Sequence, residues 1–62
     1  MEQAKILIVD DDQDIREAIQ AMLQNQQYTA ITAGGIKEGM EKVRAEKPDL
    51  VILDVMIFQC IY

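Results

Sequence analysis

Residues 6–11 read Ile-Leu-Ile-Val-Asp-Asp, and this stretch decides the fold class. A continuous run of mainly β-branched residues that ends in acids is typical of a strand buried on both faces, and such strands usually pair in parallel. A second run of this kind, Leu-Val-Ile-Leu-Asp, occupies residues 50–54. The two runs predict two parallel strands, each with a carboxylate at its carboxyl end.

The segment after the first strand has the periodicity of an amphipathic helix. Its apolar residues recur at helical spacing: Ile15, Ile19, Met22 and Leu23. The spacing of Asp14 and Glu17 is that of a capping box, with Asp12 as an alternative cap, and the polar residues 25–27 end the helix. We expect Met22, like Met40 further along the chain, to fill core space, because both lie on apolar helix faces.

A weaker strand and a second helix follow along the chain. Residues 28–32 are rich in aromatic and β-branched types, which predicts a strand at an edge of the sheet. The apolar spacing in residues 36–43 predicts a helix that runs to about Glu46. Gly39 inside this helix lowers its intrinsic stability. The missing side chain therefore suggests close packing of the helix on the sheet.

The order of elements is βαβαβ, which predicts an α/β fold with a three-stranded parallel sheet flanked by two helices. If the first and third strands are neighbours, the strand order is 2-1-3 and the winding reverses between them. Ligands of open α/β sheets bind at such a reversal, outside the carboxyl ends of the strands. Asp10, Asp11 and Asp54 are expected there.

Length and composition limit the number of domains, the class of ligand and the cellular compartment. The chain has 62 residues, half of them hydrophobic, with 6 basic and 11 acidic residues and a net charge of -5. One small domain of marginal stability is expected, so a bound metal or a partner should add stability. The excess of acidic residues argues against binding of nucleic acid. No signal peptide or membrane span is visible. The single cysteine, Cys60, cannot form an internal disulfide, so a reducing cytoplasm is expected, and without histidine it has no partner for a zinc site.

Carboxylates that converge at strand ends repel one another unless a hard cation neutralises them. Mg²⁺ suits such a site because it prefers oxygen ligands. A carboxylate beside this ion can act as a nucleophile toward phosphorus, and Asp54, alone at the end of its strand, is the candidate. Asp12 and Asp14 are interpreted as helix caps only.

Residues 5–12 and 47–56, with the spacing between them, resemble the receiver domain of bacterial two-component response regulators. The resemblance covers residues 5 to about 57. It implies a flavodoxin-like fold and a role in phosphorelay signalling, not an enzyme, in which Asp54 accepts a phosphoryl group from a sensor histidine kinase or a phosphotransfer protein.

The same resemblance implies the ligands of the ion. Asp11 and Asp54 would bind Mg²⁺ directly, together with the backbone carbonyl of Met56, and Asp10 would hold the ion largely through water. Residues 1–62 would be the N-terminal half of a receiver, with the βαβαβ unit at 5–54.

The residues after Asp54 depart from the family pattern. Phe58, Ile61 and Tyr62 stand where receivers have a proline and an Asp-Gly pair. The fourth and fifth strands, with their Ser or Thr and their Lys, are missing. Phosphoryl acceptance is therefore expected to be impaired by truncation.

Residues 55–62 form a divergent apolar tail without charge, beside a third strand whose outer edge has no neighbour. Such an edge recruits another chain, so we expect a homo-oligomer through the third strand and the tail. The alternative function is a truncated, non-catalytic fragment that acts only as a dimerisation or assembly module. A phosphatase of the haloacid dehalogenase type, with Asp10 and Asp12 as its acids, would leave Asp54 unexplained.

Overall fold

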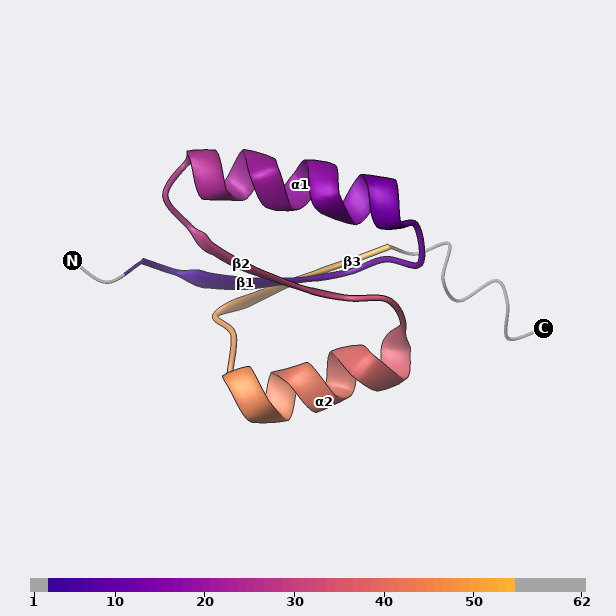
Figure 1. Cartoon of the computed structure of the whole chain (residues 1–62). Coiled ribbons are helices and arrows are strands. Elements are labelled where there is room, and N and C mark those ends of the chain that lie inside the picture. Colours follow the sequence, from indigo (N-terminus) through magenta and orange to yellow (C-terminus); the bar gives the residue numbers. More distant parts are fainter. Residues whose placement is uncertain (1–2, 55–62) are drawn as a thin grey trace.

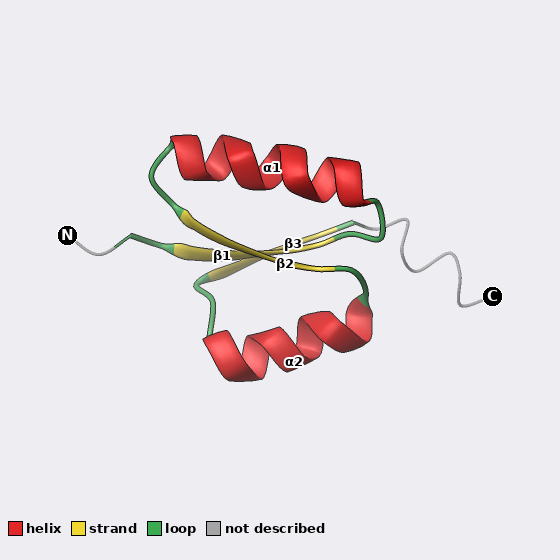
Figure 2. Ribbon diagram, in the orientation of Figure 1, coloured by secondary structure: helices red, strands yellow, loops and turns green. Residues whose placement is uncertain are grey.

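The structure, a computed structural model, describes residues 3–54. Its elements follow in the order β1 (Lys5–Val9), α1 (Gln13–Asn25), β2 (Thr29–Ala33), α2 (Ile36–Glu46) and β3 (Leu50–Leu53). The strands form a parallel sheet in the order β2-β1-β3, with α1 on one face and α2 on the other (Figures 1 and 2). The predicted flavodoxin-like fold class, strand order and edge position of β2 are confirmed.

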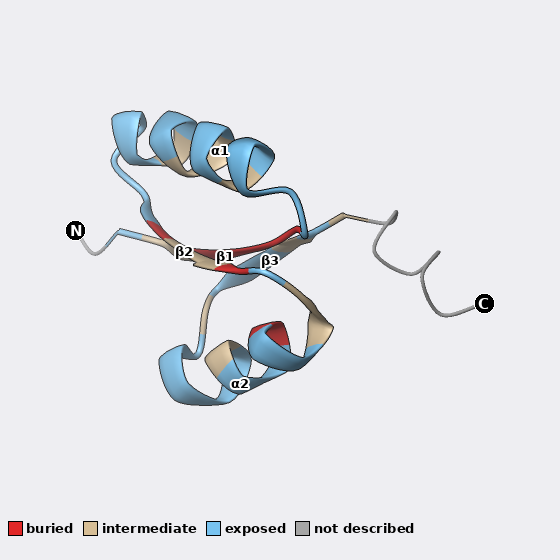
Figure 3. Cartoon of the chain, turned by 45° about the vertical axis from the view of Figure 1, so that its right-hand side comes forward, coloured by how far each residue is buried: buried red, intermediate tan, exposed pale blue. Residues whose placement is uncertain are grey.

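Strand β1 lies at the centre of the sheet and contains most of its buried residues. It pairs with β2 from Lys5↔Thr29 onward and with β3 from Ile6↔Leu50 onward. Leu7 and Ile8 are the largest fully buried side chains, and burial is concentrated in the middle of the sheet (Figure 3). The prediction that the first apolar run is buried on both faces is therefore confirmed.

Helix α2 approaches β1 closely at Gly39. A Cβ atom at this position would lie 3.0 Å from Cγ2 and 3.3 Å from Cγ1 of Val9, closer than ordinary van der Waals contact. Val9 belongs to the buried cluster with Leu7 and Ala33, against which Ile36 at the start of α2 also packs. The predicted reason for a glycine inside this helix is confirmed.

The N-terminus of α1 is capped by Asp12, one of the two caps considered. Its Oδ1 accepts hydrogen bonds from the amides of Asp14 (2.9 Å) and Ile15 (3.3 Å). Glu17 does not complete a capping box with Asp14, because its carboxylate accepts from the side-chain amide of Gln13 at 2.8 Å. The cap interpretation of Asp12 is confirmed, and the capping box is wrong.

The expected core positions of Met22 and Met40 are also wrong. Met22 is 60% exposed and Met40 is 53% exposed. Both helices pack mainly on β1 and β2, so the described part of the chain has no layer that would cover the outer side of either apolar face. Helical periodicity identified the apolar faces correctly but overestimated how much of each face is buried.

Strand β3 is exposed along most of its length. Leu50, Val51 and Leu53 are 55%, 42% and 40% exposed. On the α2 side, an open apolar groove of about 210 Å³ lies between the helix and the strand. Its lining includes Val9, Ile36, Met40, Val43, Val51 and Leu53.

Some predictions fall outside the described residues. The backbone carbonyl of Met56, the apolar tail 55–62 and Cys60 lie beyond residue 54. Within residues 3–54, neither helix combines the length and apolar character needed to cross a bilayer.

Candidate metal centre

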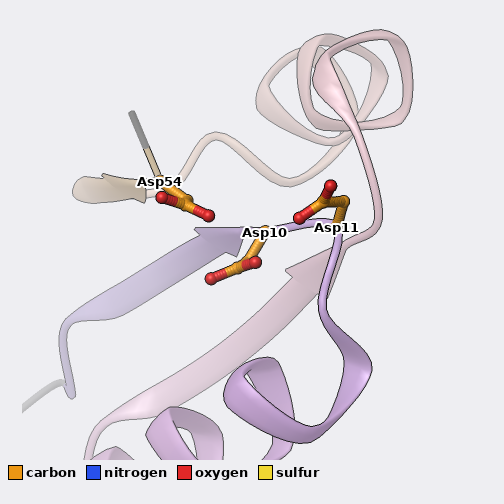
Figure 4. A group of neighbouring side chains, drawn as sticks. All are labelled: Asp10, Asp11 and Asp54. Atoms are coloured by element: carbon orange, nitrogen blue, oxygen red, sulfur yellow. The ribbon is translucent and has the colours of Figure 1, made fainter. Parts of the chain in front are cut away.

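Three carboxylates meet at the carboxyl edge of the sheet. Asp10 and Asp11 follow β1 directly, and Asp54 follows β3 (Figure 4). One carboxylate oxygen from each residue lies within 4.8 Å of the others. The structure thus brings together the three acidic side chains that the sequence analysis selected.

The pairing of β1 with β3 accounts for this proximity. Val9 and Leu53 are register partners, so the residues that follow them leave the sheet side by side. The Asp54 amide donates to the Val9 carbonyl at 3.0 Å, and the Asp10 amide donates to the Ala33 carbonyl at 3.2 Å. These bonds extend the ladder by one residue on each side of β1 and fix the backbone from which Asp10 and Asp54 project.

Burial differs among the three acids. Asp10 is buried, with 5% exposure, whereas Asp54 is half-buried and Asp11 is exposed. Asp10 Oδ1 accepts a hydrogen bond from the Asp12 amide at 2.9 Å, which fixes the orientation of this carboxylate. The cluster therefore has a rigid, buried side at Asp10 and an open side at Asp11 from which a ligand can enter.

Arg16 is a residue of this site that the sequence analysis missed. It lies in the first turn of α1, and its Nη1 donates to the backbone carbonyl of Asp10 at 2.7 Å. The sequence signal was its position six residues after Asp10, on the side of the helix opposite the apolar residues. This hydrogen bond places a cationic guanidinium against the β1–α1 loop.

The donor set of the cluster fits a hard divalent cation. Three carboxylates at this separation repel one another, and a bound cation relieves that repulsion. All three side chains offer oxygen, the ligand that Mg²⁺ and Ca²⁺ prefer, and the sequence has no histidine that would favour zinc or another transition metal. Asp10, Asp11 and Asp54 therefore fit Mg²⁺ by their chemistry, while the predicted carbonyl ligand at Met56 lies outside the described residues.

Two further polar residues near the strand ends make contacts that support the fold. Asp12 uses Oδ1 to cap α1, which removes support for a catalytic Asp10–Asp12 pair of the dehalogenase type. Lys5 begins β1 at the amino ends of the strands, on the side of the sheet away from the cluster. Its Nζ binds the carboxylate of Glu46 there at 3.4 Å. Its backbone amide also binds Asp49 at 2.8 Å, so Lys5 supports the fold at that end.

Comparison with known proteins points to one family. The family described as "Response regulator receiver domain" matches residues 6–60. The alkaline phosphatase synthesis transcriptional regulatory protein PhoP of Bacillus subtilis is 45% identical over 53 residues, which are 86% of this chain and 22% of that protein. The regulatory protein VanR of Enterococcus faecium is 40% identical over 53 residues, which are 86% of this chain and 23% of VanR.

A solved structure agrees with these sequences. The crystal structure of the N-terminal domain of a response regulator receiver protein from Methanoculleus marisnigri superimposes with a TM-score of 0.86 at 40% identity. The match covers 89% of this chain and 45% of that domain. The chain thus spans less than half of the solved domain and under a quarter of the two curated relatives.

Proposed function

This chain belongs to the response regulator receiver domain family, and from that premise we propose that Asp54 is its phosphoacceptor in two-component phosphorelay signalling. The observation that carries the proposal is the grouping of Asp54 with Asp10 and Asp11, within 4.8 Å, at the carboxyl edge of the sheet. The chain acts in the cytoplasm as a substrate of a sensor histidine kinase or a phosphotransfer protein, and it is not itself an enzyme.

The three acids have two roles in this proposal: Asp54 is the nucleophile, and all three bind the ion. Asp11 and Asp54 would hold Mg²⁺ directly, and the more buried Asp10 would hold it largely through water. A Mg²⁺ ion held there would supply positive charge that offsets the charge of the phosphoryl oxygens and of the acids themselves. Asp54 is only half-buried, which leaves its carboxylate accessible from the side of the cluster that faces solvent.

Phosphoryl transfer then needs one bond exchange. An oxygen of the Asp54 carboxylate bonds to phosphorus while the P–N bond of phosphohistidine breaks, and the imidazole nitrogen leaves with the electron pair. The product is an acyl phosphate on Asp54. Catalysis of such a transfer comes mainly from positioning and charge stabilisation, so the placement of the acids is the contribution of this chain.

A polypeptide of residues 1–62 on its own should carry out this reaction slowly. The resemblance assigns a phosphate-binding lysine to a fifth strand, and the described residues contain three strands. Removing one preorganised donor of this kind costs about 10²-fold to 10³-fold in rate. We therefore expect acetyl phosphate to phosphorylate Asp54 very slowly.

Intact-mass spectrometry after incubation with acetyl phosphate and Mg²⁺ tests the proposal, with Asp54→Asn as the control. Slow addition of one phosphoryl group, absent from the variant, supports it. Equal addition to Asp54→Asn would refute Asp54 as the acceptor. Rapid addition, as fast as in a complete receiver domain, would contradict the expected need for the phosphate-binding lysine.

A second candidate function is assembly of two copies through β3. Its support is the exposure of Leu50, Val51 and Leu53, together with an outer edge that pairs with no strand in residues 3–54. Such an edge offers unpaired backbone groups to a second copy, and apolar side chains would be buried on both faces. Sedimentation at micromolar concentration tests this candidate, and a compact folded monomer would contradict it.

A further inference from the structure

Arg16 closes a ring of hydrogen bonds around the turn that carries the acids. The Asp12 amide donates to Asp10 Oδ1 at 2.9 Å, and the Arg16 amide donates to the Asp12 carbonyl at 3.0 Å. The guanidinium of Arg16 then returns to the Asp10 carbonyl at 2.7 Å. Both the backbone and the side chain of Asp10 are therefore held by the segment that follows it.

The guanidinium is also confined from the side of β2. A Cβ atom on Gly34 would lie 3.4 Å from Arg16 Nη1, so the arginine packs against the loop that joins β2 to α2. The Gly34 amide is in turn bound by Glu38 Oε1 at 3.0 Å. Arg16 thus occupies a fixed place between the carboxyl ends of β1 and β2.

From this geometry we infer that Arg16 is a positioning residue for the cation site. It fixes the Asp10 carbonyl and so the direction in which the chain turns into Asp11, the exposed ligand. This inference rests on the proposed Mg²⁺ site, and it adds a residue that touches neither the ion nor the phosphoryl group. The Arg16–Asp10 contact bears on affinity because groups that orient metal ligands typically change it by about 10-fold to 100-fold.

The direction in which Arg16→Gln changes the Mg²⁺ affinity distinguishes a positioning role from an effect of charge. Arg16 is cationic and lies beside an acidic cluster, so its charge alone opposes the binding of a second cation. If charge dominated, Arg16→Gln would bind Mg²⁺ more tightly than the wild type. If positioning dominates, as inferred, Arg16→Gln binds Mg²⁺ about 10-fold more weakly despite the lost positive charge.

Calorimetric titration of the whole chain with MgCl₂ tests the inference. Arg16→Gln removes the charge and shortens the side chain, whereas Arg16→Lys keeps the charge but loses the planar fork. Arg44→Gln is the matched control, because Arg44 is the basic residue in the last turn of α2. That turn also contains Glu46, which binds Lys5 at the amino ends of the strands, away from the cluster.

We expect the affinity to fall from wild type to Arg16→Lys to Arg16→Gln, with Arg44→Gln close to wild type. Hydrogen exchange at the Asp12 amide should accelerate in the same order, a change that a general loss of stability would not confine to this turn. Equal or tighter Mg²⁺ binding in Arg16→Gln would overturn the inference while leaving the metal site intact.

Three further outcomes also bear on the inference. If the wild type and Asp11→Ala both fail to bind Mg²⁺, the proposed site fails and the role of Arg16 fails with it. If Arg16→Gln does not fold, the affinity of Arg16→Lys decides. If neither variant folds, Arg16 is a determinant of folding, and the positioning role is refuted.

Discussion

Strands β1 and β3 have nearly the same sequence pattern and very different environments. Each is an apolar run followed by aspartate, and the two pair in register from Ile6↔Leu50 to Val9↔Leu53. Every residue of β1 after Lys5 is buried, whereas three of the four residues of β3 are exposed. The difference shows that an apolar run reports the capacity of a strand to be buried, while its place in the sheet decides whether burial occurs.

The same comparison explains how the site is built. The buried Asp10 and the exposed Asp11 both follow the central strand, and the half-buried Asp54 follows the edge strand. The central strand therefore contributes two of the three acids, and its register pairing with the edge strand brings the third beside them. The predictions below test this division, from the largest expected effect to the smallest.

Leu7→Ala should be the most damaging change, because Leu7 is 0% exposed in the central strand. Removing a fully buried leucine side chain costs about 3 kcal/mol, enough to unfold most of so small a chain. Leu50→Ala is the matched change in β3 and should cost about 1 kcal/mol or less. Urea denaturation measures both. Equal losses would mean that β3 is covered in solution.

Asp11→Ala should weaken Mg²⁺ binding by at least about 10-fold, because the remaining acids no longer supply two direct ligands. Asp14→Ala removes the same charge from the first turn of α1 outside the cluster and should leave the affinity almost unchanged. Calorimetric titration compares the two variants. Unchanged affinity in Asp11→Ala would place the metal elsewhere.

Gly39→Ala should lower stability by about 1 kcal/mol, although alanine favours a helix by about the same amount. Both methyl groups of Val9 face the new Cβ, at 3.0 and 3.3 Å, so rotation of Val9 does not relieve the contact. Gly35→Ala is the control, because no atom outside its chain neighbours lies within 4 Å of the added Cβ.

Thermal unfolding measures the effect, and the Val9→Ala background should reduce the penalty of Gly39→Ala. A penalty that is the same in both backgrounds would contradict the close packing of α2 on β1.

Val51→Lys should change the stability of the fold least, by about 0.5 kcal/mol or less, because the side chain is already 42% exposed. A charge on this edge strand should nevertheless block pairing with a second copy. Gln24→Lys, on the exposed surface of α1, adds the same charge elsewhere. Sedimentation should show a monomer for Val51→Lys and the wild-type state for Gln24→Lys; the same state in both would exclude β3 as the interface.

Particular residues show why some features were predictable. Both ends of α2 and the C-terminus of α1 were predicted well because they depend on local chemistry, whereas the start of α1 was left open between two caps. Asp12 caps the first helix, and Lys47 ends the second in a left-handed conformation directly before Pro48. Met22 and Met40 were placed wrongly because their burial depends on whether another layer covers the helix, which periodicity does not report.

The sequence by itself determined the order of elements, the parallel sheet and the acids that follow its strands, since these depend on side-chain period and on residues adjacent in the chain. Only the tertiary structure decided that β1 is buried while β3 is exposed, and that Arg16 reaches the Asp10 carbonyl. Burial and the contacts of a long side chain depend on neighbours supplied by other elements. Their positions are set by packing, which no local pattern contains.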